Sequence, residues 1–394
     1  MTEQYDDEKS QMDLLGKFVG FHTENGNEKV LADFIHGIFE EAGVNSTVLP
    51  FKDDPKRANL VAEVGGGDPV LVLTGHMDTV SAQQEGWQTD PFEVVEKDDM
   101  IYGRGVTDMK AGLAAMVITM LRLKRVESRL HGTVRFLATA GEEINMPGAE
   151  LLHDGGYMKD AEALLIGEPS AYSPVYATKG ELNLEITMHG KSAHSSMPQL
   201  GANAVEGLVT FLYRLTDRIR RQTAGITNPD LGETVFNIDV IKGGSQVNTI
   251  PESARAEINM RVIPDLSNKE ILKMVDDEVA KFNAENKAQV SYEVTMDIVP
   301  IVGAKESRLG DIVREVGDES LQAQGKDDRI KFVGVSGGTD ASRLFVDKPV
   351  GQPCLAFGPG NFTMHCVNES LPKHMYFEFI DMYERITKKY MGVE

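Results

Sequence analysis

The feature that most restricts the fold of this chain is an apolar run that ends just before a histidine and an aspartate. Residues 69–73 are all proline, valine or leucine, which is typical of a strand buried on both faces. His76 and Asp78 follow, and alternate residues of an extended segment point the same way. In open α/β sheets, ligands bind beyond this end of a strand. An ordinary polar turn is the alternative, and these residues alone do not decide between the two.

The composition limits the size of the protein and its partners. A chain of 394 residues predicts two or three domains. The formal net charge of -21 opposes binding to nucleic acid and to anionic membrane surfaces. The longest apolar helical stretch, residues 111–121, is too short to span a bilayer. We therefore expect no nucleic-acid partner and no membrane association.

The cysteines and the first residues favour a cytoplasmic location. Cys354 and Cys366 are too few for a disulfide framework, and such sparing use of cysteine suits a reducing compartment. Residues 1–9 are acidic and polar, unlike a signal peptide.

Strands alternate with helices along most of the chain, which predicts an α/β fold with a mostly parallel sheet flanked by helices. Between residues 179 and 298 the pattern changes to strand, helix, two strands and helix, and the alternation of apolar residues indicates strands with one exposed face. A smaller α+β sandwich is expected there. The predicted domains are a discontinuous catalytic domain, 1–178 and 299–394, and an inserted domain, 179–298.

Acidic or imidazole residues are expected at the ends of the parallel strands, all on one side of the sheet. They are His76, Asp78, Asp108, Glu142, Glu143 and Glu168, with His365 late in the chain. Carboxylates gathered in one crevice repel one another unless cations neutralise them. Two histidines and three carboxylates, with one carboxylate shared, suit two zinc ions about 3.5 Å apart. A further carboxylate is then free to act as general base on a bridging water.

The ordered motifs resemble those of a known family. They are Thr-Gly-His76-Met-Asp78, Gly-Arg-Gly-Val-Thr-Asp108-Met-Lys, Gly-Glu142-Glu143, Gly-Glu168-Pro and the late His365. Together they resemble the aminoacylase/carboxypeptidase family of dizinc metallohydrolases, in particular its acetylornithine deacetylase and succinyl-diaminopimelate desuccinylase branch. The resemblance covers essentially the whole chain, including the inserted domain, and so implies a zinc-peptidase-like catalytic domain with a lid or dimerisation domain.

The resemblance implies a role for each residue of this cluster. The implied ligands are His76, Asp108 and Glu168 for one zinc ion, and Asp108, Glu143 and His365 for the other. Asp108 is then the bridging ligand, and its peptide bond to Met109 is expected to be cis. Asp78 is expected to orient His76, and Glu142 to act as the general base. Cobalt and manganese suit the same ligands as substitutes for the two zinc ions of each subunit.

Further roles are implied in the inserted domain and beyond it. His194 is expected to stabilise the tetrahedral oxyanion across a homodimer interface, which lowers the barrier by roughly 3 kcal/mol. The implied substrate contacts are Lys179, Asn248, Arg261, Gly338 and Thr339. A surface salt bridge on a strand is the alternative interpretation of Arg261. The exposed strand edges of a small sandwich also favour a homodimer through this domain.

The leading interpretation is a metal-dependent amidohydrolase that removes the acyl group from a small N-acylated amino acid. N-succinyl-L,L-diaminopimelate is the best candidate substrate, giving succinate and L,L-diaminopimelate. Lys179, Ala140 and Asp340 depart from the desuccinylase pattern, so N-acetylornithine deacetylase and a broader N-acyl-amino-acid deacylase remain open. A carboxypeptidase or dipeptidase with the same metal centre would differ only in its pocket. A non-catalytic descendant is expected to lack a ligand or the base, and this chain has them all.

Overall fold

The computed structural model describes residues 5–83, 85–349 and 351–393, so the first four residues of the acidic N-terminal stretch lie outside the described residues. Its internal contacts divide the chain into two compact units. The first comprises Met1–Tyr176, Val302–Val333 and Thr339–Glu394, and the second comprises Ala177–Ile301 and Gly334–Gly338. From the sequence we expect boundaries at 178/179 and 298/299. Residues 334–338, which the sequence does not set apart, belong to the second unit.

The first unit is built on a sheet whose central strands are parallel. Its strand order begins β1-β2-β6-β3-β7-β19. β3 runs parallel to β6 and β7, and β19 runs parallel to β7, whereas β1 and β2 are antiparallel. The bounds are β1 (Asn45–Pro50), β2 (Ala58–Gly66), β3 (Val70–His76), β6 (Gly132–Thr139), β7 (Ala161–Pro169) and β19 (Cys354–Gly358). Three short strands include residues of both units, and they are β8 (Val175–Thr178), β17 (Ile301–Val302) and β18 (Val333–Val335). The predicted α/β fold class is confirmed.

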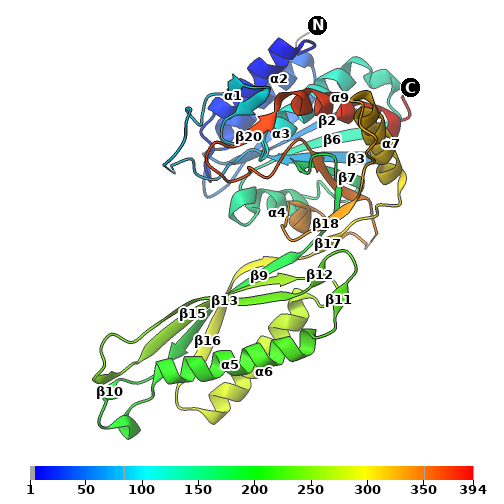
Figure 1. Ribbon diagram of the computed structural model, residues 1–394. Coiled ribbons are helices and arrows are strands. Elements are labelled where there is room, and N and C mark those ends of the chain that lie inside the picture. Colours follow the sequence, from blue (N-terminus) through cyan, green and yellow to red (C-terminus); the bar gives the residue numbers. More distant parts are fainter. Residues whose placement is uncertain (1–4, 84, 350, 394) are drawn as a thin grey trace. The chain divides into compact units, whose positions relative to one another are not determined.

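Helices cover the sheet of the first unit on both faces. Figure 1 shows α3 and α9 on one face and α4 on the other. The bounds are α1 (Glu8–Gly20), α2 (Lys29–Ala42), α3 (Lys110–Arg125), α4 (Pro147–Asp154), α7 (Arg308–Ala323), α8 (Ala341–Leu344) and α9 (Lys373–Tyr390), with short 3-10 turns η1 (Glu127–Arg129) and η2 (Glu142–Ile144). Nearly every residue of α3 is buried, which explains its apolar sequence. No helix in the described parts of the chain has both the length and the apolarity needed to cross a membrane.

Strand β3 continues further than its apolar run suggests. The run predicts an end at Thr74 and Gly75, but the structure extends the strand to His76. Gly75 fits inside the strand because the side chain of Met109 packs against it, and an added Cβ would lie 2.5 Å from Met109 Cε. The strand therefore delivers His76 directly into the interior.

Gly112 gives α3 close contact with the sheet, as the small residues of this helix predict. A Cβ at this position would lie 2.2 Å from the carbonyl oxygen of Gly167 in β7. Gly112→Ala is therefore expected to lower the free energy of unfolding by about 1–3 kcal/mol, because one partner in the clash is main chain. Denaturant unfolding measures this change. Gly37→Ala in α2 is the control, since its added Cβ meets nothing within 4 Å, and equal stabilities of the two variants would contradict the expectation.

The second unit is an α+β sandwich. Its four-stranded antiparallel sheet has the order β13-β15-β9-β16, and α5 and α6 pack on one face of it through a continuous apolar core. The bounds are β9 (Gly180–His189), β13 (Val235–Gly243), β15 (Ser253–Val262), β16 (Gln289–Ile298), α5 (Ala204–Thr223) and α6 (Asn268–Glu285), with the short elements β10 (Ala193–His194), η3 (Pro198–Leu200), β11 (Thr227–Asn228), β12 (Gly232–Glu233) and β14 (Thr249–Ile250). The sequence predicts this arrangement except for the edge strand β16.

Candidate metal centre

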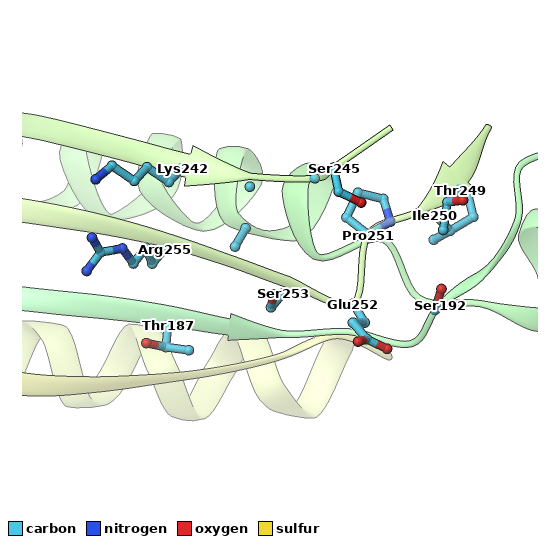
Figure 2. Close-up of a pocket in the computed structure, with 13 residues that line it drawn as sticks. Thr187, Ser192, Lys242, Ser245, Thr249, Ile250, Pro251, Glu252, Ser253 and Arg255 are labelled. Carbon is cyan, nitrogen blue, oxygen red and sulfur yellow. The ribbon is translucent and has the colours of Figure 1, made fainter. Parts of the chain in front are cut away.

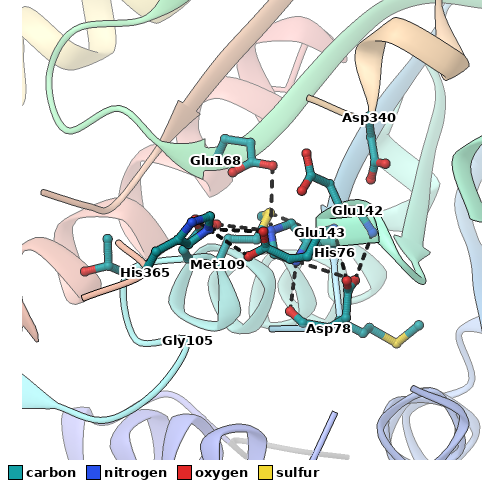
Figure 3. Close-up of polar contacts among 12 residues, drawn as sticks. His76, Asp78, Gly105, Met109, Glu142, Glu143, Glu168, Asp340 and His365 are labelled. Atoms are coloured by element: carbon teal, nitrogen blue, oxygen red, sulfur yellow. Dashed lines mark hydrogen bonds and ion pairs between the residues drawn. The ribbon is translucent and has the colours of Figure 1, made fainter. Parts of the chain in front are cut away.

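His76 lies at the carboxyl end of β3, and its side chain is buried. Its Nε2 is 3.1 Å from Oδ1 of Asp108 and 3.8 Å from Oε1 of Glu168. Glu168 reaches this position because it ends β7, the parallel neighbour of β3. Each residue of this group offers a ligand atom, and these atoms lie within 4.8 Å of one another. Figure 3 shows His76 and Glu168 within the same cluster of side chains.

A second group shares Asp108 with the first. Oδ2 of Asp108 is 3.2 Å from Nε2 of His365, and the same nitrogen is 3.1 Å from the carboxylate of Glu143. The two carboxylate oxygens of Asp108 therefore face two different histidines, which is the geometry that a bridging ligand needs. The structure brings together all five residues that the sequence proposes as ligands, in two groups that have Asp108 in common, and a third group joins His76 and Glu143 with Glu142.

Asp108 reaches the site by a different route from the one expected. It does not follow a parallel strand of the main sheet. It lies in the loop before α3, after β5 (Met100–Tyr102), which pairs with β4 (Val95–Lys97) and β20 (Ser370–Pro372) in a separate three-stranded sheet. That part of the prediction is wrong, because a glycine-rich loop, rather than a strand end, carries the carboxylate in. The peptide bond from Asp108 to Met109 is cis, as expected.

Asp78 holds the site together through an unexpected pair of contacts. The predicted partner of His76 is the Asp78 carboxylate, but the nearer group is the Asp78 carbonyl oxygen, 2.9 Å from Nδ1, whereas the carboxylate is 3.7 Å away. The carboxylate instead accepts hydrogen bonds of 2.8–3.1 Å from three successive main-chain N–H groups, those of Gly141, Glu142 and Glu143. Asp78 thus fixes both the histidine ring and the turn that carries the two glutamates.

Glu142 lies beside an additional carboxylate, that of Asp340. Burial, the charge of Glu168 and further nearby charges, among them Asp340, raise the pKa of Glu142 well above its ordinary value. Burial raises the pKa of Asp340 to about 6. Asp340 Oδ2 accepts a hydrogen bond of 2.5 Å from the Thr139 hydroxyl, while Oδ1 has no hydrogen-bond partner among the described residues. The sequence marked Asp340 only as a departure from a motif, because its burial depends on contacts with distant residues.

The protein groups around the two histidines raise the pKa of each ring. Burial lowers the pKa of His76, but its hydrogen bond to Asp108 and the charges of the surrounding carboxylates raise it well above its ordinary value. Hydrogen bonds to Asp108 and Glu143 raise the pKa of His365 to about 10. Burial opposes the ionisation of Asp108, but its bonds to the two histidines lower its pKa overall. A metal ion that binds these imidazoles must displace their protons.

The donor set fits two divalent cations. Two imidazoles and three carboxylates are nitrogen and oxygen ligands that zinc, cobalt and manganese all accept. Buried carboxylates gathered this closely need positive charge to be stable. Glu142 is the glutamate beyond the two ligand groups that share Asp108, although it also belongs to a third group with His76 and Glu143.

Two of the predicted substrate contacts lie at one end of the sheet in the second unit. The Lys179 ammonium donates a hydrogen bond of 2.6 Å to the carbonyl oxygen of Glu233. Arg261, in β15, lies opposite Glu181 of β9 and forms an ion pair of 2.7 Å with its carboxylate. This is the salt bridge that the alternative interpretation of Arg261 describes, so both cations already have protein partners in this unit.

His194 and Asn248 lie together elsewhere in the second unit. His194 is in β10, which pairs with β14, and the Ser195 N–H donates to the Asn248 carbonyl oxygen at 3.1 Å. A pocket of about 440 Å³ borders this pair of strands. Figure 2 shows several polar and charged side chains that line it, among them Ser192, Lys242 and Arg255. Of the remaining predicted contacts, Gly338 belongs to the second unit and Thr339, which is buried, to the first.

Two buried charged residues of the first unit were missed by the sequence-based reasoning. Arg104 and Glu369 form an ion pair of 2.7 Å next to the loop that carries Asp108. Arg104 lies within the Gly-Arg-Gly motif, and Glu369 follows His365 by four residues. The available signal was that both residues lie in or next to the motifs that carry the proposed ligands. Their pairing could not be predicted, because it joins segments more than 260 residues apart in the sequence.

A parallel sheet that gathers two histidines and several buried carboxylates at its carboxyl edge defines a class, the metal-dependent hydrolases of amide bonds. The chain belongs to the peptidase family M20/M25/M40, whose family model matches residues 72–389. The predicted family and the predicted hydrolase class are thereby confirmed.

Individual relatives agree with this assignment. A probable succinyl-diaminopimelate desuccinylase of Staphylococcus aureus (strain MRSA252) is 34% identical over 408 aligned positions, which cover 98% of each chain. The structure of a tripeptidase from Staphylococcus aureus subsp. aureus Mu50 matches with a TM-score of 0.75 at 23% identity, over 98% of this chain and 99% of that one. A dinuclear metal-binding M20 peptidase from Bacillus subtilis matches with a TM-score of 0.69 at 16% identity, over 98% of this chain and 99% of that one. These two structures share the fold.

Proposed function

We propose that this protein hydrolyses the amide bond of N-succinyl-L,L-diaminopimelate to give succinate and L,L-diaminopimelate. The observation that carries the chemistry is the pair of ligand groups that share Asp108 beside the free carboxylate of Glu142. The choice of substrate follows the name of the full-length relative that is 34% identical. The two cysteines of this protein, Cys354 and Cys366, are both free, which supports a cytoplasmic location.

Each residue of the centre has a role in the proposed reaction. Two zinc ions held by the two groups, or cobalt or manganese in their place, would polarise the substrate carbonyl and activate a water molecule. Glu142 would accept a proton from that water and pass it to the leaving amine, and its raised pKa suits it to both steps. Asp78 would keep the main chain of Glu142 and Glu143 in place, so that one glutamate serves as base and the other as ligand.

Asp78→Asn tests this supporting role. An amide has one acceptor oxygen and one N–H₂ donor, so it can no longer accept from all three N–H groups of the turn. We expect metal affinity or kcat/KM to fall by roughly 10–100-fold. Metal titration and steady-state kinetics measure the two quantities. Values for Asp78→Asn equal to those of the wild type would contradict the role.

We further propose a homodimer through the second unit, in which His194 stabilises the oxyanion at the metal centre of the partner subunit and Asn248 contacts the substrate there. β10, which contains His194, and β14, which begins just after Asn248, connect to the end of the sheet where Ser253 pairs with His189, whereas Arg261 pairs with Glu181. Eight residues of extended strand separate these pairs, roughly 27 Å. One small substrate cannot contact both ends of the sheet of a single chain. In a dimer, the substrate bound to one subunit could contact Arg261 of that subunit together with His194 and Asn248 supplied by the other.

The local contacts of His194 support its part in this proposal. The Ser196 N–H donates to Nδ1 of His194 at 3.2 Å, so the neutral ring carries its proton on Nε2. This nitrogen is then a hydrogen-bond donor for a developing oxyanion. The side chain is exposed in the isolated chain, as a group that acts on a partner must be.

The surface beside β13 supports a subunit contact. β13 is an edge of the four-stranded sheet, and Ile241 of that strand and Val209 and Tyr213 of α5 are exposed. Open strand edges and clustered apolar side chains are usually covered. Sedimentation of the wild type should therefore show a dimer, and Tyr213→Asp with Ile241→Lys should give a monomer with little activity. A fully active monomer would refute both the dimer and the action of His194 in trans.

The substrate is tested by amine release from N-succinyl-L,L-diaminopimelate and N-acetyl-L-ornithine, measured side by side with zinc-loaded protein. We expect a clear preference for the succinyl compound. Preference for the acetyl compound would reassign the protein as a deacetylase and make Lys179 a specificity residue. Turnover of neither compound would overturn the assigned substrate and direct the search to dipeptides and tripeptides.

A further inference from the structure

Glu369 is a buried carboxylate that binds the main chain of the loop carrying Asp108. Oε2 accepts from the Gly105 N–H at 3.0 Å. Oε1 accepts from the Thr107 N–H at 2.8 Å and from the Asp108 N–H at 3.0 Å. Three main-chain donors of a four-residue stretch thus converge on one side chain, and the last of them belongs to the proposed bridging ligand.

Arg104 completes the environment of this carboxylate. Its Nη1 donates to Oε2 of Glu369 at 2.7 Å, and both side chains are buried. The guanidinium lies over the Trp87 ring, 5.1 Å from its centre, and Nη2 donates to the Ser81 carbonyl at 3.2 Å. The charge of Glu369 is therefore neutralised by a group that is itself held on two sides.

Hydrogen bonds around Glu369 join two segments of the chain, the loop that carries Asp108 and the segment that follows His365. The Gly103 N–H donates to the Glu369 carbonyl at 3.1 Å, and the Thr107 hydroxyl donates to the Ser370 carbonyl at 2.7 Å. β5 and β20 extend this connection by antiparallel pairing. The relative position of Asp108 and His365 is thus set by contacts that centre on one residue.

Two carboxylates of this centre each accept hydrogen bonds from three main-chain N–H groups of a segment that carries ligands. Asp78 accepts three N–H groups of the turn that carries Glu142 and Glu143. Glu369 accepts three N–H groups of the loop that carries Asp108. In each case a buried carboxylate orders the backbone of a ligand-bearing segment that lies outside the main sheet.

We propose that Glu369 is a positioning residue that sets the spacing of Asp108 and His365, and so governs the ion held by Asp108, Glu143 and His365. This inference rests on the proposed metal centre. Both ions share Asp108, but the other ion depends less on Glu369, because its remaining ligands, His76 and Glu168, each lie two residues after the last pair of β3 and β7, Thr74 with Ile166, so that the sheet sets their spacing. Loss of Glu369 therefore weakens one ion selectively.

The test is the binding of metal alone to Glu369→Gln. The variant keeps the size of the side chain, but its amide N–H₂ must face N–H donors of the loop. Calorimetry with ZnCl₂, together with the visible absorption of added Co²⁺, resolves the two binding steps without substrate. For the ion held by His76, Asp108 and Glu168, we expect a dissociation constant within about threefold of the wild-type value. For the ion held by Asp108, Glu143 and His365, we expect binding at least about tenfold weaker than in the wild type.

Glu384→Gln provides the matched control. Glu384 of α9 also forms a partly buried ion pair, 2.7 Å from Arg122, but its carboxylate accepts hydrogen bonds from Arg122 and Lys388, which both lie outside the Asp108 loop. Both ions should bind to this variant as in the wild type. Glu369→Asp, which retains the charge on a shorter side chain, should show a smaller loss of the second ion than Glu369→Gln.

Several outcomes overturn the inference. Unchanged binding of both ions to Glu369→Gln, or an equal loss of both, would show that Glu369 does not act on one ion selectively. Circular dichroism and thermal unfolding of the apo variants provide a separate check. Failure of both Glu369 variants to fold would make the residue a requirement of the fold and contradict a positioning role. A wrong substrate would change none of these binding measurements, so the two proposals fail separately.

Discussion

Glu142→Gln is expected to lower kcat for amide hydrolysis by roughly 10²–10⁴-fold, the usual contribution of a general base. Glutamine preserves the shape of the side chain but cannot accept the proton of the attacking water. Because Glu142 lies outside the two ligand groups that share Asp108, both ions should remain bound. Steady-state kinetics and metal content on the same sample measure the two expectations.

The control for this prediction is Glu150→Gln, which changes an exposed glutamate of the nearby helix α4 and should leave kcat unchanged. A Glu142→Gln variant that retains full activity would exclude Glu142 as the base. A variant that loses its ions together with its activity would instead make Glu142 a ligand, and Glu143 would then be the candidate base.

Removal of divalent cations is expected to abolish turnover and to lower the melting temperature. The centre buries several carboxylates, and bound cations offset their mutual repulsion. An ion present at 100 times its Kd contributes about 2.7 kcal/mol to the stability of the folded state. Thermal unfolding with a chelator, and again after zinc is restored, measures the loss and its reversal.

Metal binding should also depend on pH in a defined direction. Neighbouring carboxylates raise the pKa of His76 against the effect of burial, and they raise the pKa of His365 to about 10, so both raised pKa values favour protonated rings over metal binding. Each ion must displace a proton, and apparent affinity should therefore rise as pH rises and fall as pH falls. Proton release on zinc addition in a weakly buffered solution gives the same quantity directly. Activity that persists in a chelator, or affinity that is independent of pH, would contradict this description of the centre.

The sequence was sufficient for those parts of the fold that depend on local patterns. The apolar run before His76 predicted a buried strand, and the strand–helix alternation predicted the sheet. Gly43, with φ of 71°, ends α2 as its sequence signal indicates. The Ser267-x-x-Glu270 pattern is typical of a capping box, and these two residues form one at the start of α6. In each case the signal and the structure lie within a few residues of one another.

The parts that could not be predicted depend on contacts between distant segments. Asp78 was expected to hold His76 with its carboxylate, but its two-residue spacing cannot reveal the Gly141–Glu143 turn that competes for those oxygens. Glu369 and Arg104 were missed because their pairing joins segments more than 260 residues apart. Asp340 is buried, and the Thr139 hydroxyl of β6, 201 residues earlier in the chain, donates a hydrogen bond to it. Local sequence identifies such residue types but not their partners.

The most direct test of the proposed centre is a crystal structure of the zinc-loaded protein with anomalous diffraction measured at the zinc edge. Two anomalous peaks are expected in each chain, about 3.5 Å apart. One should lie among His76, Asp108 and Glu168, and the other among Asp108, Glu143 and His365. A single peak, or two peaks without Asp108 as a common ligand, would contradict the two-ion centre and the mechanism built on it.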